Sequence, residues 1–305
     1  MSRWPERVTV YEVGPRDGLQ NVPDTISTET KVRFVEALRG AGLPAVEVTS
    51  FVSPKWVPQL ADGAEVFSSL KDTEGARLPV LVPNLKGLEA ALTVGAREVA
   101  VFTAASEAFN QKNINASIAE SIARFEPVAK KAQDEGLTLR GYVSTAFGCP
   151  YQGDVPEDDV VDTCDRLFQL GCAEVSVGDT IGVGDPGQVQ SLCLALGVRF
   201  ELERIALHLH DTPGRALANV VTALRCGVTT FDSSAGGLGG CPYAPGAAGN
   251  LATEDLVEML HRLGVGTGVD LEALADASVA LAEETGLPQP SRVLQAIRAR
   301  RARES

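Results

Sequence analysis

The sequence predicts a closed (β/α)₈ barrel, the TIM-barrel fold, with extra helices at its C-terminal end. Short β-rich runs alternate with helix-period segments, there are eight β units, and polar residues cluster where the expected strands end. A doubly wound open sheet shows the same alternation, but a count of eight favours the barrel. We therefore expect one catalytic domain over residues 1–305.

The expected strands are short runs rich in β-branched and aromatic residues. They cover residues 8–13, 45–50, 79–84, 98–103, 139–144, 174–179, 204–210 and 229–234. The first expected helix, within residues 27–42, has a start signal in Ser27 or Thr28 followed by Glu29. Glycines that end helices are expected at Gly42, Gly95, Gly136, Gly171 and Gly227. Residues 253–303 are expected to add further helices on or beside the barrel.

The formal net charge is −13, which argues against general binding to nucleic acid or to an anionic membrane. This charge does not exclude a phosphate-bearing small molecule, which needs only a local positive pocket. No apolar run approaches the roughly 18–20 residues of a membrane helix. The N-terminus passes almost at once into a strand pattern, so we expect a cytoplasmic protein.

Polar side chains that can carry chemistry fall at the ends of the expected strands. They are Glu12, Arg16, Asp17, Glu47, Asp179, His208, His210 and Asn250. A closed parallel barrel brings its C-terminal strand ends together at one face, where barrel enzymes place their active sites. We therefore expect these residues to gather around one site.

His208 and His210 are two residues apart, and on a strand this spacing puts both side chains on one face. The pair by itself fits a metal site and a pair of hydrogen-bonded core or surface histidines equally well. With Asp17 and Asn250 at other strand ends, the metal site is favoured. The set contains no thiolate, so Mg²⁺ or Mn²⁺ fits better than structural Zn²⁺.

Arg16 and Cys241 are further candidates. Arg16 has planar donors that suit a carboxylate or an enolate oxygen, although an ordinary ion pair with a nearby acid would also explain it. Cys241 lies in the glycine-rich loop GGLGGCPYAPGAAGN, which can act as a lid and bring a thiol to a substrate carbon. Glu12, Glu47 and Asp179 are candidates for acid–base chemistry or for ion pairs inside the barrel.

Motifs along nearly the whole chain, from residue 8 to about 270, resemble those of hydroxymethylglutaryl-CoA lyases. The motifs are EVGPRDGLQN, EVTSFVSPKWVPQLAD, VLVPN, NINASIAES, STAFGCPYQGDV, SVGDTIGVG, HLHDTPGRALAN and DSSAGGLGGCPYAPGAAGNLATEDLVEML. RDG and HxHD alone would indicate only the wider superfamily of metal-dependent lyases and Claisen-type synthases. The glycine-rich loop narrows the resemblance to the lyases.

The resemblance implies a retro-Claisen cleavage of 3-hydroxy-3-methylglutaryl-CoA to acetyl-CoA and acetoacetate. It also implies a place in leucine degradation or ketone-body metabolism, and a homodimer. The family's metal ligands fall on Asp17, His208, His210 and Asn250, its charge-stabilising arginine on Arg16, and its catalytic cysteine on Cys241. Glu12, Glu47 and Asp179 match further acidic positions of its active site.

Four positions depart from the family's usual pattern. They are Val22, Gln152, Pro213 and Arg215. All lie beside the expected site and outside the ligand set, so a lyase for a longer 3-hydroxy-3-alkylglutaryl-CoA is an alternative. A Claisen-type synthase usually carries C-terminal regulatory domains, for which this chain has no residues left. A binding protein on an inactive barrel would lack a ligand or Cys241, and this sequence has all of them.

Overall fold

A computed structural model describes residues 4–71, 73, 77–212, 214–240 and 249–304 of the chain. The strands are β1 (Thr9–Glu12), β2 (Ala45–Val46), β3 (Thr49–Ser50), β4 (Val80–Leu81), β5 (Glu98–Ala104), β6 (Thr138–Ser144), β7 (Glu174–Asp179), β8 (Ile205–Leu209) and β9 (Thr230–Ser233). All paired neighbours run parallel, in the order β2-β1-β9-β8-β7-β6-β5-β4-β3.

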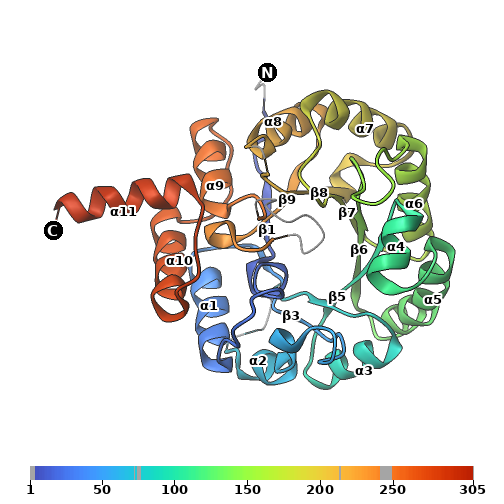
Figure 1. Ribbon diagram of the computed structural model, residues 1–305, viewed down its shortest axis with the longest axis horizontal. Helices are drawn as coiled ribbons and strands as arrows, with labels where there is room; N and C mark the ends of the chain where they lie inside the picture. The colour runs from blue at the N-terminus through green and yellow to red at the C-terminus, as the bar shows by residue number, and fades with distance from the viewer. Residues whose placement is uncertain (1–3, 72, 74–76, 213, 241–248, 305) are drawn as a thin grey trace.

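The two ends of this order, β2 and β3, are pieces of one strand over residues 45–50. On one side the Glu47 amide donates to the Glu12 carbonyl at 2.8 Å, and on the other the Val48 amide donates to the Pro79 carbonyl at 3.0 Å. The strand thus joins β1 to β4 and closes the sheet. The described chain is therefore a closed barrel of eight strand positions, as the sequence predicts (Figure 1).

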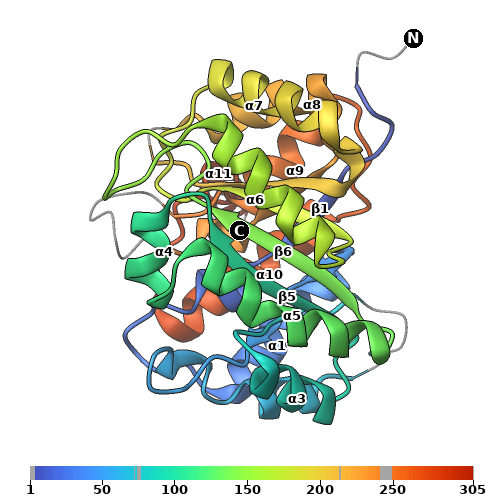
Figure 2. The ribbon, with the colours of Figure 1, turned by 90° about the vertical axis from the view of Figure 1, so that its right-hand side faces the viewer.

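Helices surround the barrel on the outside. They are α1 (Thr28–Gly40), α2 (Gly63–Ser69), α3 (Leu85–Thr93), α4 (Glu107–Ile114), α5 (Ile118–Asp134), α6 (Glu157–Gln169), α7 (Pro186–Arg199), α8 (Ala216–Cys226), α9 (Thr253–Arg262), α10 (Leu271–Thr285) and α11 (Arg292–Glu304). Short helical turns are η1 (Gly14–Gly18), η2 (Pro58–Leu60), η3 (Leu202–Arg204) and η4 (Ala235–Gly237). Figure 2 shows the strands inclined within the helical layer.

The helices begin and end where local chemistry dictates. The Ser27 side chain accepts from the Thr30 amide and so caps α1 at the expected position. All five glycines expected to end helices have positive φ values. α9 follows the last strand and takes the eighth place in the ring, whereas α10 packs on α1 and α11 packs on α9 outside it (Figure 1).

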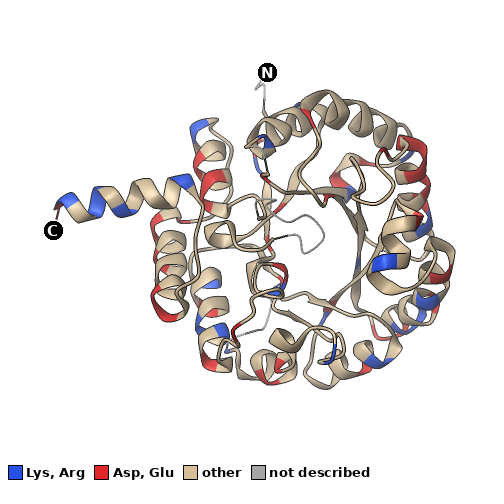
Figure 3. Ribbon diagram, in the orientation of Figure 1, with Lys and Arg blue, Asp and Glu red and all other residues tan. Residues whose placement is uncertain are grey.

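Strand side chains alternate between two environments. Val8, Val10, Leu207 and Leu209 face outward into the core between strands and helices. Their neighbours along the strands face the barrel interior, which holds polar and charged side chains. Most other charged residues lie on the surrounding helices (Figure 3). No helix in the described part of the chain has both the length and the apolarity needed to span a bilayer.

Gly42 and Gly95 offer a matched test of how glycine ends these helices. Both have positive φ, +88° and +83°, but a Cβ at Gly42 would meet the carbonyl oxygen of Gly268, whereas a Cβ at Gly95 meets open space. We expect Gly95→Ala to lower the free energy of unfolding by about 1 kcal/mol, from backbone strain alone. Gly42→Ala should cost about 2–3 kcal/mol, because strain and clash add.

Urea denaturation of the two variants beside the unmodified protein measures the difference. Equal losses would show that the close approach to Gly268 contributes nothing to stability.

Candidate functional site

A cavity of about 630 Å³ opens at the C-terminal ends of the strands. Arg16 and Asp17 reach it from η1, which directly follows β1, and His208 and His210 reach it from the end of β8. Tyr142 of β6 also lines it. Residues distant in sequence meet here because all the strands are parallel and end at one face of the barrel.

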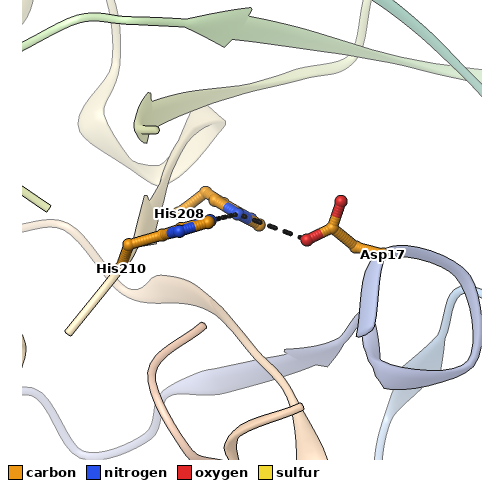
Figure 4. A group of neighbouring side chains, drawn as sticks. All are labelled: Asp17, His208 and His210. Atoms are coloured by element: carbon orange, nitrogen blue, oxygen red, sulfur yellow. Dashed lines mark hydrogen bonds and ion pairs between the residues drawn. The ribbon is translucent and has the colours of Figure 1, made fainter. Parts of the chain in front are cut away.

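The Asp17 carboxylate and the two imidazoles point toward one another (Figure 4). One ligand atom from each of Asp17, His208 and His210 lies within 4.8 Å of the others. The Nε2 atoms of the two histidines are 3.3 Å apart, and His208 Nε2 is 3.9 Å from Asp17 Oδ2. Three donor atoms that converge in this way can share one cation.

Asn250 completes this group from the other side. It pairs with His210 as an isolated antiparallel bridge, and its Nδ2 donates to Asp17 Oδ2 at 2.8 Å. The Oδ1 of Asn250 is buried and has no hydrogen-bond partner among the described residues. A buried polar atom is normally satisfied, so this amide oxygen suits an additional ligand. Two imidazoles, a carboxylate and an amide oxygen fit a divalent cation.

The charge states suit metal binding. Burial, and next the neighbouring His208, lower the pKa of His210 to about 4, so its imidazole is neutral at neutral pH and keeps a lone pair. Burial raises the pKa of Asp17, but Arg16 and the two histidines outweigh burial and hold it at about 2. The centre therefore presents one anion and a neutral nitrogen donor.

Arg16 joins two of the predicted acids. Its NH1 donates to Asp17 Oδ1 at 2.7 Å, and its Nε donates to Glu47 Oε2 at 2.7 Å. The Tyr142 hydroxyl donates to the same Glu47 oxygen at 3.2 Å, and the Tyr142 ring lies edge-on to the ring of His208. Glu47 therefore fixes the guanidinium beside the cavity, on the side where His208 lies.

Glu12 and Asp179 do not line the cavity. Glu12 lies on the same outward face as Val8 and Val10, and Asp179 on the same outward face as Val175 and Val177. Their carboxylates bind backbone instead. Glu12 and Asp179 thus lie on the outer side of the strands, away from the cavity. The residues that the site brings together are Arg16, Asp17, Glu47, His208, His210 and Asn250.

Glu12 connects the two loops that border the site. Its Oε1 accepts from the amides of Gly14 at 2.7 Å and Ala235 at 3.0 Å, and its Oε2 accepts from the Thr253 hydroxyl at 2.6 Å. Gly14 begins η1 and Ala235 begins η4. Asp179 similarly accepts from the amides of Val183 and Gly184 at 2.9 Å and shapes the loop after β7.

Other positions singled out in the sequence have varied surroundings. Cys241 and Pro213 lie outside the described residues. Gln152 accepts from the Ser106 hydroxyl, and Arg215 donates to the Val183 carbonyl. Neither of these two side chains lines the cavity.

Comparison with known proteins identifies the family. The sequence model of the HMGL-like family matches residues 7–280. The chain belongs to the HMGL-like family. The mitochondrial hydroxymethylglutaryl-CoA lyase of Bos taurus is 50% identical, over 96% of this chain and 90% of that protein.

Two solved structures are also similar to this HMGL-like chain. A Bacillus subtilis HMG-CoA lyase has a TM-score of 0.95 and 50% identity, covering 98% of this chain and all of that one. An HMG-CoA lyase from Acinetobacter baumannii, in complex with coenzyme A and 3-methylmalate, has a TM-score of 0.91 and 37% identity, with 95% of both chains covered. These likenesses confirm the resemblance that the motifs indicate.

Three residues around this HMGL-like site are not among those that the sequence singles out: Arg140, Tyr142 and Asp232, although Asp232 begins the motif DSSAGGLGG. Tyr142 lies between Arg16 and His208, and Asp232 contacts His208 Nδ1 at 3.3 Å. Their signal in the sequence is strand alternation. Arg140 and Tyr142 are two apart on β6, and on β9 Asp232 is one residue from the buried Phe231 and so lies on the opposite face. A buried charge on an inward strand position requires a partner, and that requirement indicates the site.

The buried carboxylate of Glu12 predicts a pH dependence of stability. Burial raises the pKa of Glu12 to about 7, against hydrogen bonds that lower it. Because the folded pKa lies above the unfolded one, the contribution to stability is full at low pH and is lost as the pH rises toward 7 and beyond. Glu12→Gln keeps the acceptor for the two amides and removes this loss.

We expect Glu12→Gln to gain up to about 3 kcal/mol relative to the unmodified protein between pH 4.5 and pH 8. Urea unfolding of both proteins across this range measures the difference, in which the contributions of other titrating groups cancel. Parallel stability curves would contradict a raised pKa at Glu12.

Proposed function

We propose that this chain is a hydroxymethylglutaryl-CoA lyase, a carbon–carbon lyase that cleaves 3-hydroxy-3-methylglutaryl-CoA to acetyl-CoA and acetoacetate. The observation that carries the proposal is the convergence of Asp17, His208 and His210 in the cavity, in a chain half identical to lyases over nearly their full length. Asn250 and Arg16 flank this centre.

Asp17, His208, His210 and Asn250 would hold Mg²⁺ or Mn²⁺. Their mixed nitrogen and oxygen donors support a cation that keeps positions for substrate oxygens. When bound, the cation supplies positive charge that favours loss of the proton from the tertiary hydroxyl of the substrate. The proton goes to a base beside that hydroxyl. Asp17 is the candidate, because its carboxylate keeps lone pairs, whereas His208 would bind the cation through Nε2 and donates from Nδ1 to Asp232.

Loss of that proton lets the C2–C3 bond break. The electron pair of the bond moves into the thioester fragment, which leaves as an enolate, and the other fragment is acetoacetate. Arg16 is placed to stabilise the enolate oxygen, because Asp17 and Glu47 hold its guanidinium beside the cavity. An oriented donor of this kind contributes about 3–4 kcal/mol in related cases.

Cys241 then delivers a proton to the enolate carbon and completes acetyl-CoA. Its loop begins beside η4, which Glu12 ties to η1 and thereby to Arg16 and Asp17. We assign Glu12 and Asp179 the task of positioning the loops around the site. Glu47 positions Arg16.

The substrate class is supported by the cavity rim. Lys112 and Arg124 are exposed and line the cavity, so they offer positive charge to the phosphates of an acyl-CoA. The Acinetobacter baumannii relative binds coenzyme A. A longer 3-alkyl group is the alternative substrate, and cytoplasmic location and a homodimer stay predictions.

A substrate panel tests the proposal. We expect the purified protein to form acetoacetate from hydroxymethylglutaryl-CoA with Mg²⁺ or Mn²⁺, to lose activity on chelation, and to regain it when either cation is added. A coupled assay across thioesters of increasing 3-alkyl length, measuring acetyl-CoA release, separates the two candidate substrates. Cleavage of none of them in the presence of metal would exclude a lyase.

Cys241→Ala tests the proton donor. We expect this variant to lose turnover by about 100-fold or more, because general acid catalysis commonly contributes that much. Mn²⁺ affinity, measured by calorimetry, should be unchanged, because no thiol belongs to the ligand set. Cys226→Ala, at a half-buried position on α8, is the control for loss of a cysteine. Full activity of Cys241→Ala would remove Cys241 from the mechanism.

A further inference from the structure

Asp232 is a buried carboxylate directly beside His208 on the barrel sheet. β8 and β9 are parallel neighbours whose register pairs His208 with Asp232. Both side chains face the interior, and His208 Nδ1 lies 3.3 Å from Asp232 Oδ2. The Asp232 side chain is fully buried. The sheet register itself therefore fixes this contact.

Several donors hold the Asp232 carboxylate in place. Arg140 of β6 donates through NH2 to Oδ1 at 2.6 Å and through NH1 to Oδ2 at 3.2 Å. Ser176 of β7 donates to Oδ2 at 2.7 Å. Arg140 is itself held by Glu174 at 2.7 Å, and its guanidinium stacks on the ring of Tyr11. Asp232 therefore stays ionised and cannot turn away from His208.

An ionised carboxylate can only accept a hydrogen bond, so the Nδ1 of His208 must carry the proton. In the neutral imidazole the Nε2 atom then has a free lone pair, and this atom is the one that faces His210 Nε2 and Asp17. A metal-binding imidazole needs this lone pair, and the partner of its other nitrogen decides which tautomer forms.

We propose that Asp232 is a positioning residue, which holds His208 as the Nδ1–H tautomer and so presents Nε2 to the metal centre of the proposed lyase. Arg140 and Ser176 fix the carboxylate that does so. The inference rests on the proposed function only in treating His208 as a ligand, because the tautomer itself is a property of the protein alone.

His210 differs from His208 in this respect. Its Nδ1 is buried and has no hydrogen-bond partner among the described residues. The two imidazoles are therefore inequivalent, with one tautomer set by a charged neighbour and the other unassigned. This difference predicts that a change at Asp232 acts on His208 alone.

Asp232→Asn reverses the hydrogen bond. Arg140 can bond only the one remaining oxygen, so the amide NH₂ turns toward His208 and donates to Nδ1. The proton of His208 then lies on Nε2 and points into the metal centre. We expect the ¹⁵N spectrum of the metal-free variant, at alkaline pH, to show His208 as the Nε2–H tautomer. The chain has three histidines, so assignment is direct.

Metal binding gives a second readout that does not depend on activity. Loss of such a partner typically weakens metal affinity by about 10–100-fold. We expect this loss for Mn²⁺ in Asp232→Asn by calorimetry. Glu174→Gln is the matched control, because it removes charge from the other partner of Arg140 and leaves the contact between Asp232 and His208 intact. It should keep the tautomer and the affinity of the unmodified protein.

Asp232→Asn also leaves Arg140 buried with less compensation, which can prevent folding. The double variant Asp232→Ala with Arg140→Met removes both charges, and there we expect a mixture of His208 tautomers with weakened Mn²⁺ binding. An Nε2–H tautomer in the unmodified protein would overturn the proposal. So would an unchanged tautomer or Mn²⁺ affinity in either folded variant. A failed lyase assay with the expected tautomers would overturn only the proposed reaction.

Discussion

The ion pair between Arg140 and Asp232 constrains the whole barrel interior. Both side chains are almost completely buried, so each has lost the hydration it has in the unfolded chain, and the opposite charge of the other compensates much of that loss. Arg140 comes from β6 and Asp232 from β9, and Glu174 and Ser176 of β7 supply the remaining bonds. Removing one partner of such a pair costs about 3–5 kcal/mol, so the strands that hold the site are fixed relative to one another.

The same network reaches the functional centre in two directions. Through Asp232 it contacts His208, and through Tyr142, whose ring lies beside the Arg140 guanidinium, it reaches Glu47 and then Arg16. The groups that stabilise the barrel interior are therefore also those that orient the candidate ligands and the candidate enolate partner. Packing and function share these side chains because the interior of the barrel opens directly into the cavity.

Much of this architecture follows from sequence pattern. The expected strand 174–179 is observed at the same residues, and expected 98–103 extends by one residue. The expected strand 79–84 shrinks to Val80–Leu81, because Pro79 and Pro83 have no amide to donate to a neighbouring strand. The four residues that motif spacing indicates, Asp17, His208, His210 and Asn250, lie close together. Asp232 begins the motif DSSAGGLGG, but nothing in that motif predicts its contact with His208, which depends on the register of two strands.

The alternation of side chains along a strand explains why two of the acids at strand ends do not reach the cavity. Glu12 and Asp179 stand at strand ends like the ligands, yet each shares its face with outward valines and cannot reach the cavity. The position of a residue along its strand determines at which end of the barrel its side chain lies. Its odd or even place in the strand determines whether the side chain faces the barrel interior or the surrounding helices. Both conditions must hold before an acidic residue can contact a substrate.

The outward carboxylates act on the site through the loops above it. Glu254, at the start of α9, accepts from the amide of Gly236 in η4 and from the Ser278 hydroxyl of α10. Glu12 accepts from the amide of the preceding residue, Ala235, and from the amide of Gly14 in η1. Burial raises the pKa of each carboxyl to about 7. The added helix α10 is thus bonded to the turn that leads toward Cys241, so a C-terminal extension outside the ring supports the geometry of the cavity.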